Sequence, residues 1–343
     1  MKEKPVVAVT GGAGYIGSHT VIALYEAGYT PVIIDDFRTS SKDVPERIAQ
    51  ITRTPIKVLD LDVSDGKSLA EVLRPLHCRA IIHFAAYKAV SESIANPQKY
   101  FSNNIGAMLG ALHAATECGI NHFVFSSSCT VYGAPTVIPV TEETPLSFIT
   151  PYGFTKLAGE NVLQQLSETH PEFRTVSLRY FNPVGGHPSG LLGDDPTGGT
   201  NNLIPLLTRS AAGRSGRIKI FGSDYPTPDG TCIRDYIHVM DVAQAHVAAL
   251  RYLEEATHPG QRAFNIGLGE GMSVKALIEL FNEVNELNIP YETAGRREGD
   301  IPSIYADTEK ARRDLKWQPI HTIREALRSA WQYEKNRSNI TKP

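Results

Sequence analysis

The sequence is short of cysteine, of long apolar runs and of clustered charge, and each shortage excludes a class of protein. Four cysteines lie far apart among 343 residues, without Cys-x-x-Cys pairs or histidines at metal-ligand spacing. We therefore expect neither disulfides nor a metal site. No apolar run approaches the ~18 residues of a membrane span, so we expect no membrane partner.

The charges are balanced and dispersed. Lysine and arginine total 34, aspartate and glutamate total 37, and the net charge is −3. Such a chain offers no basic patch for nucleic acid, so we expect a small-molecule partner. The apolar stretch at residues 6–9 reaches glycines too soon for a signal core and is typical of a first strand. These features favour a cytoplasmic protein, and the length allows two lobes.

Short apolar runs alternate with helical patterns through the first half of the chain. The runs are continuously apolar, as in parallel strands that are buried on both faces. The expected strands are 6–10, 32–35, 56–59, 80–84, 123–126 and 175–178. The expected helices are 16–27, 68–73, 105–118, 152–169, 239–252 and 274–287. The pattern predicts an α/β fold with a Rossmann-type doubly wound parallel sheet.

A glycine-rich loop separates the first expected strand from the first helix. Gly11, Gly14 and Gly17 would allow a tight turn and let a pyrophosphate approach the backbone at the helix N-terminus. Asp35 ends the next strand, where a carboxylate can accept hydrogen bonds from ribose hydroxyls and repel a 2′-phosphate. The loop therefore predicts NAD, although nearby Arg38 keeps NADP open, and a glycine turn without a ligand is the alternative.

After residue 182 the sequence becomes rich in turn formers. Residues 183–190 and 193–199 read as long loops, which in a compact protein are usually binding loops or lids. We therefore expect a smaller C-terminal substrate-binding lobe. The predicted NAD-binding domain is 1–182 with a returning segment near 232–262. The predicted substrate-binding domain is 183–231 and 263–343.

Tyr152 and Lys156 are the strongest candidates for chemistry. Thr150 is a good N-cap and Pro151 suits the first helical position, so the pair should lie on one face of a helix start. A neighbouring ammonium favours the ionised phenol. This spacing also occurs on many solvated helices, but here a serine-rich strand end at residues 125–130 precedes it.

Several motifs resemble a known family. Residues 10–17, the Ser-Ser-Ser-x-Thr-Val-Tyr-Gly stretch at 126–133 and the Tyr-x-x-x-Lys helix resemble the extended short-chain dehydrogenase/reductases. More closely, four further motifs are similar to the UDP-glucose 4-epimerase family, and the resemblance runs from about residue 5 to about residue 317. These motifs lie at 179–185, 201–203, 234–239 and 296–300.

The resemblance implies an isomerase that interconverts UDP-galactose and UDP-glucose, a reaction of galactose metabolism. In that family the tyrosine is the base, the serine hydrogen-bonds the reacting oxygen, and the lysine binds the nicotinamide ribose and lowers the tyrosine pKa. These roles would fall to Tyr152, Ser128 and Lys156. A transient 4-keto sugar would form and be reduced on its opposite face, so NAD is regenerated and need not leave.

The resemblance also implies the binding residues and a homodimer formed through helices 105–118 and 152–169. The implied cofactor-binding residues are Gly11, Gly14, Tyr15, Ile16, Gly17, Asp35, Asp36, Asp62, Val63, Phe84, Ala85, Ala86, Lys88, Asn103, Ser126, Tyr152, Lys156 and Tyr180. The implied residues for the UDP-hexose are Lys88, Ser128, Tyr152, Phe181, Asn182, Asn202, Leu203, Arg234, Arg297, Asp300 and Ile304.

Two departures from the family pattern and several rivals bear on this interpretation. Ala86 replaces a frequent glycine, a harmless change, and Ile304 stands where a tyrosine excludes N-acetylated sugars and a small residue admits them. Activity on UDP-N-acetylglucosamine is thus an alternative. Nucleotide-sugar dehydratases and decarboxylases carry acids where this chain has Cys129 and Thr130. A dehydrogenase that releases NADH and a non-catalytic NAD-binding protein are further alternatives.

Overall fold

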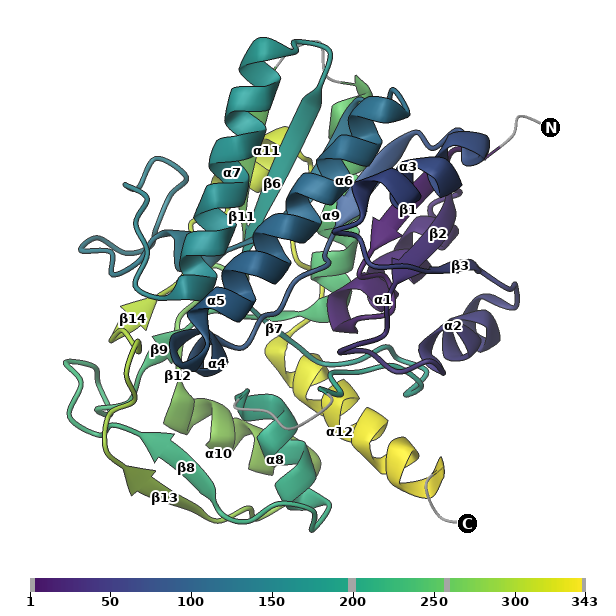
Figure 1. Ribbon diagram of the computed structural model, residues 1–343. Helices are drawn as coiled ribbons and strands as arrows, with labels where there is room; N and C mark the ends of the chain where they lie inside the picture. The colour runs from purple at the N-terminus through teal and green to yellow at the C-terminus, as the bar shows by residue number, and fades with distance from the viewer. Residues whose placement is uncertain (1–3, 197–201, 256–259, 341–343) are drawn as a thin grey trace.

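The computed structural model describes residues 4–196, 202–255 and 260–340. A parallel sheet of seven strands forms the larger lobe (Figure 1), in the order β11-β6-β5-β4-β1-β2-β3. This confirms the predicted fold class and the six predicted strands, and β11 adds a seventh. The strands are β1 (Val6–Thr10), β2 (Thr30–Asp35), β3 (Lys57–Asp60), β4 (Ala80–His83), β5 (His122–Ser128), β6 (Arg174–Tyr180) and β11 (Gln261–Ile266).

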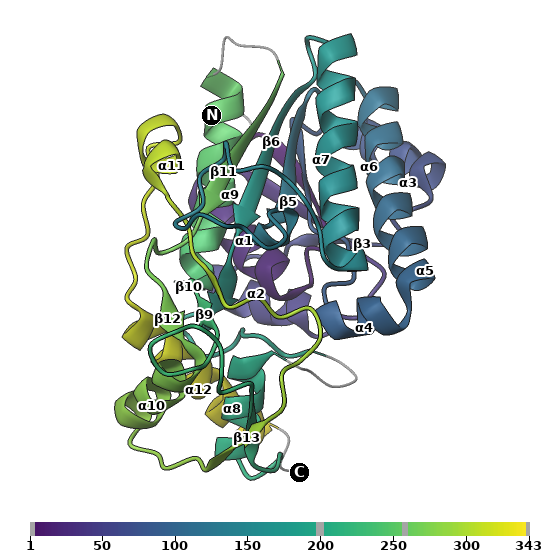
Figure 2. The ribbon, with the colours of Figure 1, turned by 90° about the vertical axis from the view of Figure 1, so that its left-hand side faces the viewer.

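Helices cover both faces of this sheet, because both faces of the strands are apolar (Figure 2). On one face α1 (Tyr15–Glu26), α2 (Val44–Thr52) and α9 (Val239–Glu255) pack in one apolar cluster with β1. On the other, α3 (Gly66–Leu73), α6 (Gly106–Glu117) and α7 (Pro151–Thr169) form a second cluster. The predicted helices agree with these bounds within three residues, whereas α2 was not predicted.

Short helical turns lead into these helices. After β4 the chain forms α4 (Val90–Ala95), α5 (Pro97–Tyr100) and a π-helical turn, η2 (Phe101–Ile105), before α6 begins. Two single 3-10 turns follow α3 and β5, namely η1 (Arg74–Leu76) and η3 (Cys129–Val131). The turn η3 directly follows the serine-rich end of β5, and so places residues 129–131 at the carboxyl edge of the sheet.

The returning segment is longer than the sequence indicated. Strand β11 pairs with β6 from Gln261 to Ile266, so the stretch after α9 stays in the large sheet beyond residue 262. Helix α11 (Glu309–Asp314) contacts β11, and Trp317 donates a hydrogen bond to the carbonyl of Asp241 on α9. Parts of the C-terminal third therefore belong physically to the larger lobe.

The smaller lobe is built from three short sheets and three helices around its own apolar core (Figure 2). Strand β9 belongs to this lobe, although the sequence grouped residues 232–234 with the returning segment. The helices are α8 (Leu203–Ala211), α10 (Val274–Asn285) and α12 (Ile323–Ile340). The strands are β7 (Asn182–Val184), β8 (Ile218–Phe221), β9 (Ile233–Arg234), β10 (Tyr236–His238), β12 (Met272–Ser273), β13 (Tyr291–Ala294) and β14 (Ser303–Ile304).

In the described part of the chain, none of the helices has both the length and the apolar character that a membrane crossing requires.

Helix α6 approaches the turn that leads into α3 so closely that a glycine is required at the contact. A Cβ on Gly110 would lie 2.1 Å from the carbonyl oxygen of Val63. Substituting Gly110→Ala should therefore lower the free energy of unfolding by about 1 to 3 kcal/mol, because the backbone must shift to relieve the overlap. Urea unfolding followed by circular dichroism measures this change.

Gly106→Ala on the same helix is the matched control. Its Cβ would meet only the Cβ of Ser64, at an ordinary 3.7 Å. Because alanine favours helix over glycine, this variant should be neutral or more stable by up to about 1 kcal/mol. Equal losses in both variants would contradict the close approach at Gly110.

Candidate active site

The catalytic candidates meet at the carboxyl end of β5. Ser128 is the last residue of that strand, and Tyr152 and Lys156 lie in the first two turns of α7. The predicted cap is present, since the Thr150 hydroxyl accepts a hydrogen bond from the backbone N–H of Gly153 at 3.2 Å. The cap and Pro151 fix where the helix starts and thus which side chains face the strand.

The buried Lys156 ammonium joins the helix to the strand. Its Nζ donates to the carbonyl oxygen of Ser126 at 2.7 Å and lies 5.8 Å from the centre of the Tyr152 ring. The hydroxyl groups of Ser126 and Tyr180 are hydrogen-bonded at 2.7 Å, which ties β6 to the same point. Ser128 ends β5 near the Tyr152 phenol, and its hydroxyl acts to lower the pKa of that phenol. Lysine, serine and tyrosine are thus brought together at one place.

Burial controls the protonation of this group. It raises the pKa of Tyr152 well above that of free tyrosine, and the Ser128 hydroxyl opposes that rise only in part. Burial also lowers the pKa of Lys156 to about 7, against the opposing effect of the Glu160 carboxylate. Desolvation is thus the largest effect on the phenol, and the lowering of its pKa by Lys156 together with the charged nicotinamide stays a prediction.

A buried ion pair lies one helical turn beyond Lys156. Glu160 and Arg179 have side chains that are only 4% and 5% exposed, and Arg179 binds the carboxylate through Nε at 3.0 Å and Nη2 at 2.6 Å. Ser127 donates to the same carboxylate at 2.5 Å. The pair therefore links α7, β5 and β6 directly behind the catalytic group.

This network continues to the far edge of the sheet. Arg179 Nη1 donates to the Tyr132 hydroxyl at 3.0 Å, and that hydroxyl donates to Asn265 Oδ1 on β11 at 2.6 Å. The sequence reasoning did not identify Glu160 or Tyr132. The signal was available for Glu160, because it lies four residues after Lys156 on the same helix face and so shares its buried environment.

The glycine loop is shaped to hold a dinucleotide. Gly11 has a φ of +69°, and a Cβ on Gly17 would lie 2.2 Å from the Gly11 carbonyl oxygen. Gly14 caps α1 without any side-chain hydrogen bond to the first turn, so the helix N-terminus presents its N–H groups as an anion site. These features fit the pyrophosphate of NAD.

Asp35 is positioned to accept ribose hydroxyls. It ends β2, is 8% exposed, and accepts hydrogen bonds from the backbone N–H groups of Ala13 and Phe37 at 2.9 and 3.0 Å. Burial raises the pKa of this carboxyl, and these hydrogen bonds oppose the rise. The carboxylate is thus held beside the glycine loop, and its binding of ribose hydroxyls stays a prediction.

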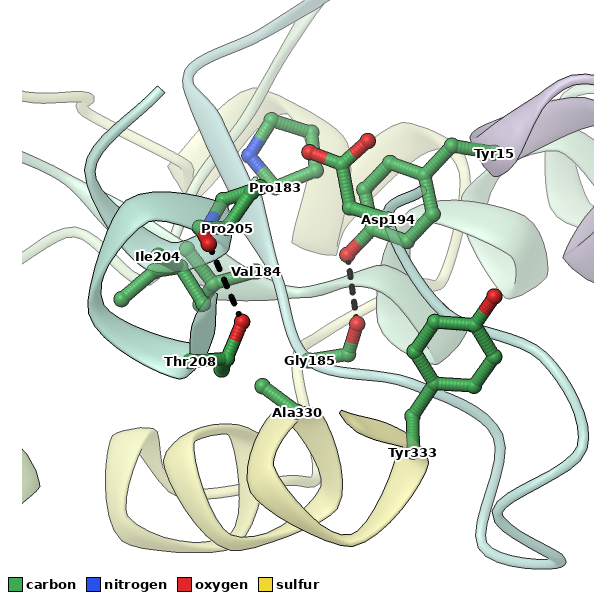
Figure 3. A pocket seen from close by; sticks show the side chains of 10 residues that line it. All are labelled: Tyr15, Pro183, Val184, Gly185, Asp194, Ile204, Pro205, Thr208, Ala330 and Tyr333. Atoms are coloured by element: carbon green, nitrogen blue, oxygen red, sulfur yellow. Dashed lines mark hydrogen bonds between the residues drawn. The ribbon is translucent and has the colours of Figure 1, made fainter. Parts of the chain in front are cut away.

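Tyr15 joins the two lobes (Figure 3). Its hydroxyl donates to the carbonyl oxygen of Gly185 at 2.8 Å, beside a cavity of about 10 Å³. Asp194 also lines this cavity and binds Lys88 at 3.1 Å, and the Lys88 ammonium lies 5.2 Å from the centre of the Tyr15 ring. Two residues predicted to bind cofactor or substrate therefore also hold the seam between the lobes.

The substrate-binding candidates gather around β9 and the segment before β14. Asp300 binds Arg297 at 2.9 Å and Arg234 at 3.4 Å, so this predicted trio meets in one place. The Asn182 Oδ1 atom is buried and has no hydrogen-bond partner among the described residues, as expected of an atom that faces a polar ligand.

Ile304 lies beneath the same region. It pairs with Arg234 across β14 and β9, is 3% exposed, and packs in an apolar cluster with Cys129 and Phe181. Asn202 and Leu203 lie at the start of α8. The predicted loop at 193–199 and the motif at 201–203 lie partly outside the described residues, since 197–201 are not described.

Comparisons with known proteins agree with this geometry. The family described as "NAD dependent epimerase/dehydratase family" matches residues 7–267. The chain belongs to this family. It is 46% identical to a UDP-glucose 4-epimerase of Dictyostelium discoideum over 96% of this chain and 95% of the relative.

Solved structures of family members have the same architecture. A UDP-glucose 4-epimerase of Stenotrophomonas maltophila with bound NAD and formylated UDP-arabinopyranose is 40% identical, with a TM-score of 0.95 over 99% of this chain and 100% of the other. One from Bifidobacterium longum in complex with NAD⁺ and UDP is 41% identical, with a TM-score of 0.93 over 97% and 99%. The agreement extends over both lobes.

Removing one partner of the buried ion pair should lower the free energy of unfolding more than replacing both partners with apolar residues. Arg179→Met leaves the Glu160 carboxylate buried without its partner, so we expect a loss of about 3 to 5 kcal/mol in the free energy of unfolding. The double variant Glu160→Met with Arg179→Met should lose much less than the sum of the two single changes. Urea unfolding of all three variants measures the coupling.

Arg324→Met is the control for removing an arginine. Its partner is Glu283, and both side chains are about half exposed, at 47% and 62%. We expect a change within about 0.5 kcal/mol. Additive losses in the double variant would mean that Glu160 and Arg179 act independently.

Proposed function

We propose that this protein is an isomerase that interconverts UDP-galactose and UDP-glucose with tightly held NAD, a step of galactose metabolism. The observation that carries the proposal is the meeting of Ser128, Tyr152 and Lys156 at the carboxyl edge of the same parallel sheet whose first strand ends in the glycine loop. The Arg234–Asp300 cluster joins this region through Ile304, which pairs with Arg234 and packs with Cys129. Family membership at 46% identity supports the same reading.

Tyr152 would take the proton from the 4-hydroxyl of the sugar and return it after the new configuration is set. Ser128, at the end of β5 beside the phenol, would donate a hydrogen bond to the reacting oxygen. When bound, the oxidised cofactor supplies a positively charged ring and a reversible hydride acceptor for the sugar C4. That charge is needed, because burial by itself keeps the Tyr152 pKa high.

Lys156 would orient the site. Its ammonium is fixed by the Ser126 carbonyl and remains able to donate to a ribose hydroxyl, since a lysine carries three N–H donors. With a pKa of about 7, it is partly charged at neutral pH, and binding of an acceptor would favour the charged form. The buried Glu160 acts in the same direction.

The arginine cluster would hold the diphosphate of the substrate. Arg234 and Arg297 share Asp300, and Arg234 also donates to the Ile301 carbonyl at 2.8 Å. Guanidinium groups bind phosphate by charge-assisted hydrogen bonds. Fixing the nucleotide end in this way would leave the sugar free to turn over, so that C4 can be reduced on its other face.

Related chemistries need acids that this site lacks. Dehydratase and decarboxylase activities require a carboxyl group directly after Ser128, where this chain has Cys129 and Thr130. Burial raises the pKa of the Cys129 thiol to about 12, so it would not transfer a proton at neutral pH. The free thiols also suit the reducing cytoplasm, where we place this protein.

In the decisive assay, purified protein is incubated with UDP-galactose and no NAD is added. We expect UDP-glucose to appear and no net NADH to accumulate, because the cofactor is regenerated in each cycle. Chromatography of the nucleotide sugars and absorbance of NADH measure both. No UDP-glucose, even with NAD added, would overturn the proposal, whereas steady NADH release would favour a dehydrogenase.

Tyr152→Phe is the variant matched to this assay. It removes one hydroxyl from a buried ring, so the fold and bound NAD should remain while turnover falls by roughly two to four orders of magnitude. Circular dichroism and the NAD content check the fold. Turnover close to that of the unaltered protein would mean that another residue is the base.

Acceptance of N-acetylated sugars depends on Ile304. Isoleucine is smaller than tyrosine yet fills its apolar cluster, so we expect slow turnover of UDP-N-acetylgalactosamine beside UDP-galactose. Ile304→Ala should raise the kcat/KM ratio of the N-acetylated to the plain sugar by about tenfold, the size of effect that a few methylene groups produce. A ratio unchanged by this substitution would show that Ile304 does not set the sugar range.

We propose a homodimer formed through α6 and α7, which lie side by side in both views (Figures 1 and 2). Leu109 on α6 is 52% exposed on the outer face of this pair. Sedimentation equilibrium should give twice the mass of 37.6 kDa, and Leu109→Glu should shift the protein toward monomer because it places a charge in the contact. A monomeric mass for the unaltered protein would contradict this arrangement.

A further inference from the structure

Arg38 occupies an unusual position beside the glycine loop. It follows β2 closely and reaches acceptors on three separate segments of the larger lobe. Its Nε lies 2.6 Å from Asp36 Oδ2, its Nη1 donates to Asn103 Oδ1 at 2.8 Å, and its Nη2 donates to Asp62 Oδ2 at 2.5 Å. One guanidinium therefore connects the end of β2, the segment after β3 and the π-helical turn before α6.

The acceptors are themselves held in place. Asp62 Oδ1 accepts the backbone N–H and the hydroxyl of Ser64 at 2.9 and 2.7 Å. Asp36 Oδ1 accepts the backbone N–H of Arg38 at 3.0 Å. Each carboxylate thus uses one oxygen to fix its own orientation and turns the other toward the arginine. A planar guanidinium matches such a fixed set of acceptors better than an ammonium does.

The surroundings of Arg38 differ from those of an ordinary surface pair. Its side chain is 39% exposed, and three of its N–H groups are committed. Lys42, farther along the same loop, forms an ion pair with Asp60 at 3.0 Å and lies 5.4 Å from the centre of the Phe37 ring, and the side chains of Lys42 and Asp60 are 75% and 58% exposed. The Lys42–Asp60 pair is thus a typical weak surface ion pair. Arg38 differs, because it is less exposed and binds three acceptors.

The three acceptors of Arg38 all belong to the set that the family resemblance implies for NAD, and Asp36 directly follows Asp35, the residue expected to bind the adenosine ribose. An arginine in this place would ordinarily be taken as a reader of the 2′-phosphate of NADP. Here it is engaged by two carboxylates, so the local charge stays negative, and the buried Asp35 adds to it. Such an acidic surface repels a further phosphate.

We propose that Arg38 is a strap that retains NAD, by holding together the three segments that border the adenosine site, and that it does not read a 2′-phosphate. The proposal rests on the proposed NAD-dependent function and adds a positioning residue to it. Because the strap links segments that must separate for the adenosine end to leave, it slows release of the cofactor. This role of Arg38 explains how the protein can prefer NAD over NADP although an arginine lies near Asp35.

The test measures exchange of bound NAD for radiolabelled NAD in purified protein, with Arg38→Ala, Arg38→Lys and Lys42→Ala as variants. We expect Arg38→Ala to exchange NAD about ten times faster or more, because it loses several charge-assisted hydrogen bonds. Arg38→Lys keeps the charge but cannot span three acceptors, so it should resemble Arg38→Ala. Lys42→Ala should exchange NAD at the rate of the unaltered protein.

Two further measurements distinguish the proposed role of Arg38 from two alternatives. One alternative is that the variant destabilises the whole protein, and the other is that Arg38 recognises the 2′-phosphate of NADP. Calorimetry with UDP probes the far side of the site, and its affinity should be the same in Arg38→Ala as in the unaltered protein. NADP should bind far more weakly than NAD to the unaltered protein, and Arg38→Ala should not weaken NADP further.

Each opposite result has a definite meaning. Unchanged NAD exchange in Arg38→Ala overturns the strap, as does full rescue by Arg38→Lys, which would indicate charge alone. A parallel loss of UDP affinity indicates loosening of the whole protein, and a selective loss of NADP binding makes Arg38 a phosphate reader. If the unaltered protein neither contains nor binds NAD, the proposed function itself fails.

Discussion

The Glu160–Arg179 ion pair is the interaction on which the geometry of the site depends. A carboxylate and a guanidinium at 4% and 5% exposure are tolerated only when each satisfies the other, because solvation is lost for both. The carboxylate comes from α7 and the guanidinium from β6, and the hydroxyl of Ser127 on β5 donates a hydrogen bond to the same carboxylate. Sliding any of these elements by a residue would leave a bare charge in the core.

That constraint explains why serine, tyrosine and lysine meet where they do. Ser127 precedes Ser128 on β5, and Glu160 follows Lys156 by one helical turn, so fixing the first member of each pair fixes the second. The catalytic candidates therefore take their position from the Glu160–Arg179 pair and Ser127. Its protonation follows from the same burial, which raises the pKa of Tyr152 and lowers that of Lys156.

Local patterns made much of this structure predictable. The apolar runs gave six strands, the glycine spacing gave the loop, and Thr150 with Pro151 gave the start of α7, since each depends on neighbours in the sequence. Strand β11 was not predicted, because its role is set by pairing with β6 across some eighty residues. Helix α12 was missed as well: its polar residues hide the apolar stripe formed by Ala326, Leu327 and Ala330.

The site residues show the same division. Residue types and spacing pointed to Asp35, Tyr152 and Lys156, and the family resemblance pointed to Ser128, whereas the partners of the charged groups could not be read from spacing. Arg234 and Arg297 share Asp300, and Arg38 joins Asp36 to Asp62, only because the fold brings distant loops together. The protonation of buried groups was likewise out of reach, because it depends on how completely the surrounding chain excludes water.

The passage of the chain back into the large sheet at β11 has a mechanical consequence. The polypeptide crosses from one lobe to the other after β6, again between β10 and α9, and again after β11, so several covalent connections span the seam. Several connections that span one seam restrain sliding and twisting of the two lobes against each other. Neither lobe is a single continuous segment, so one cut in the chain could not separate them.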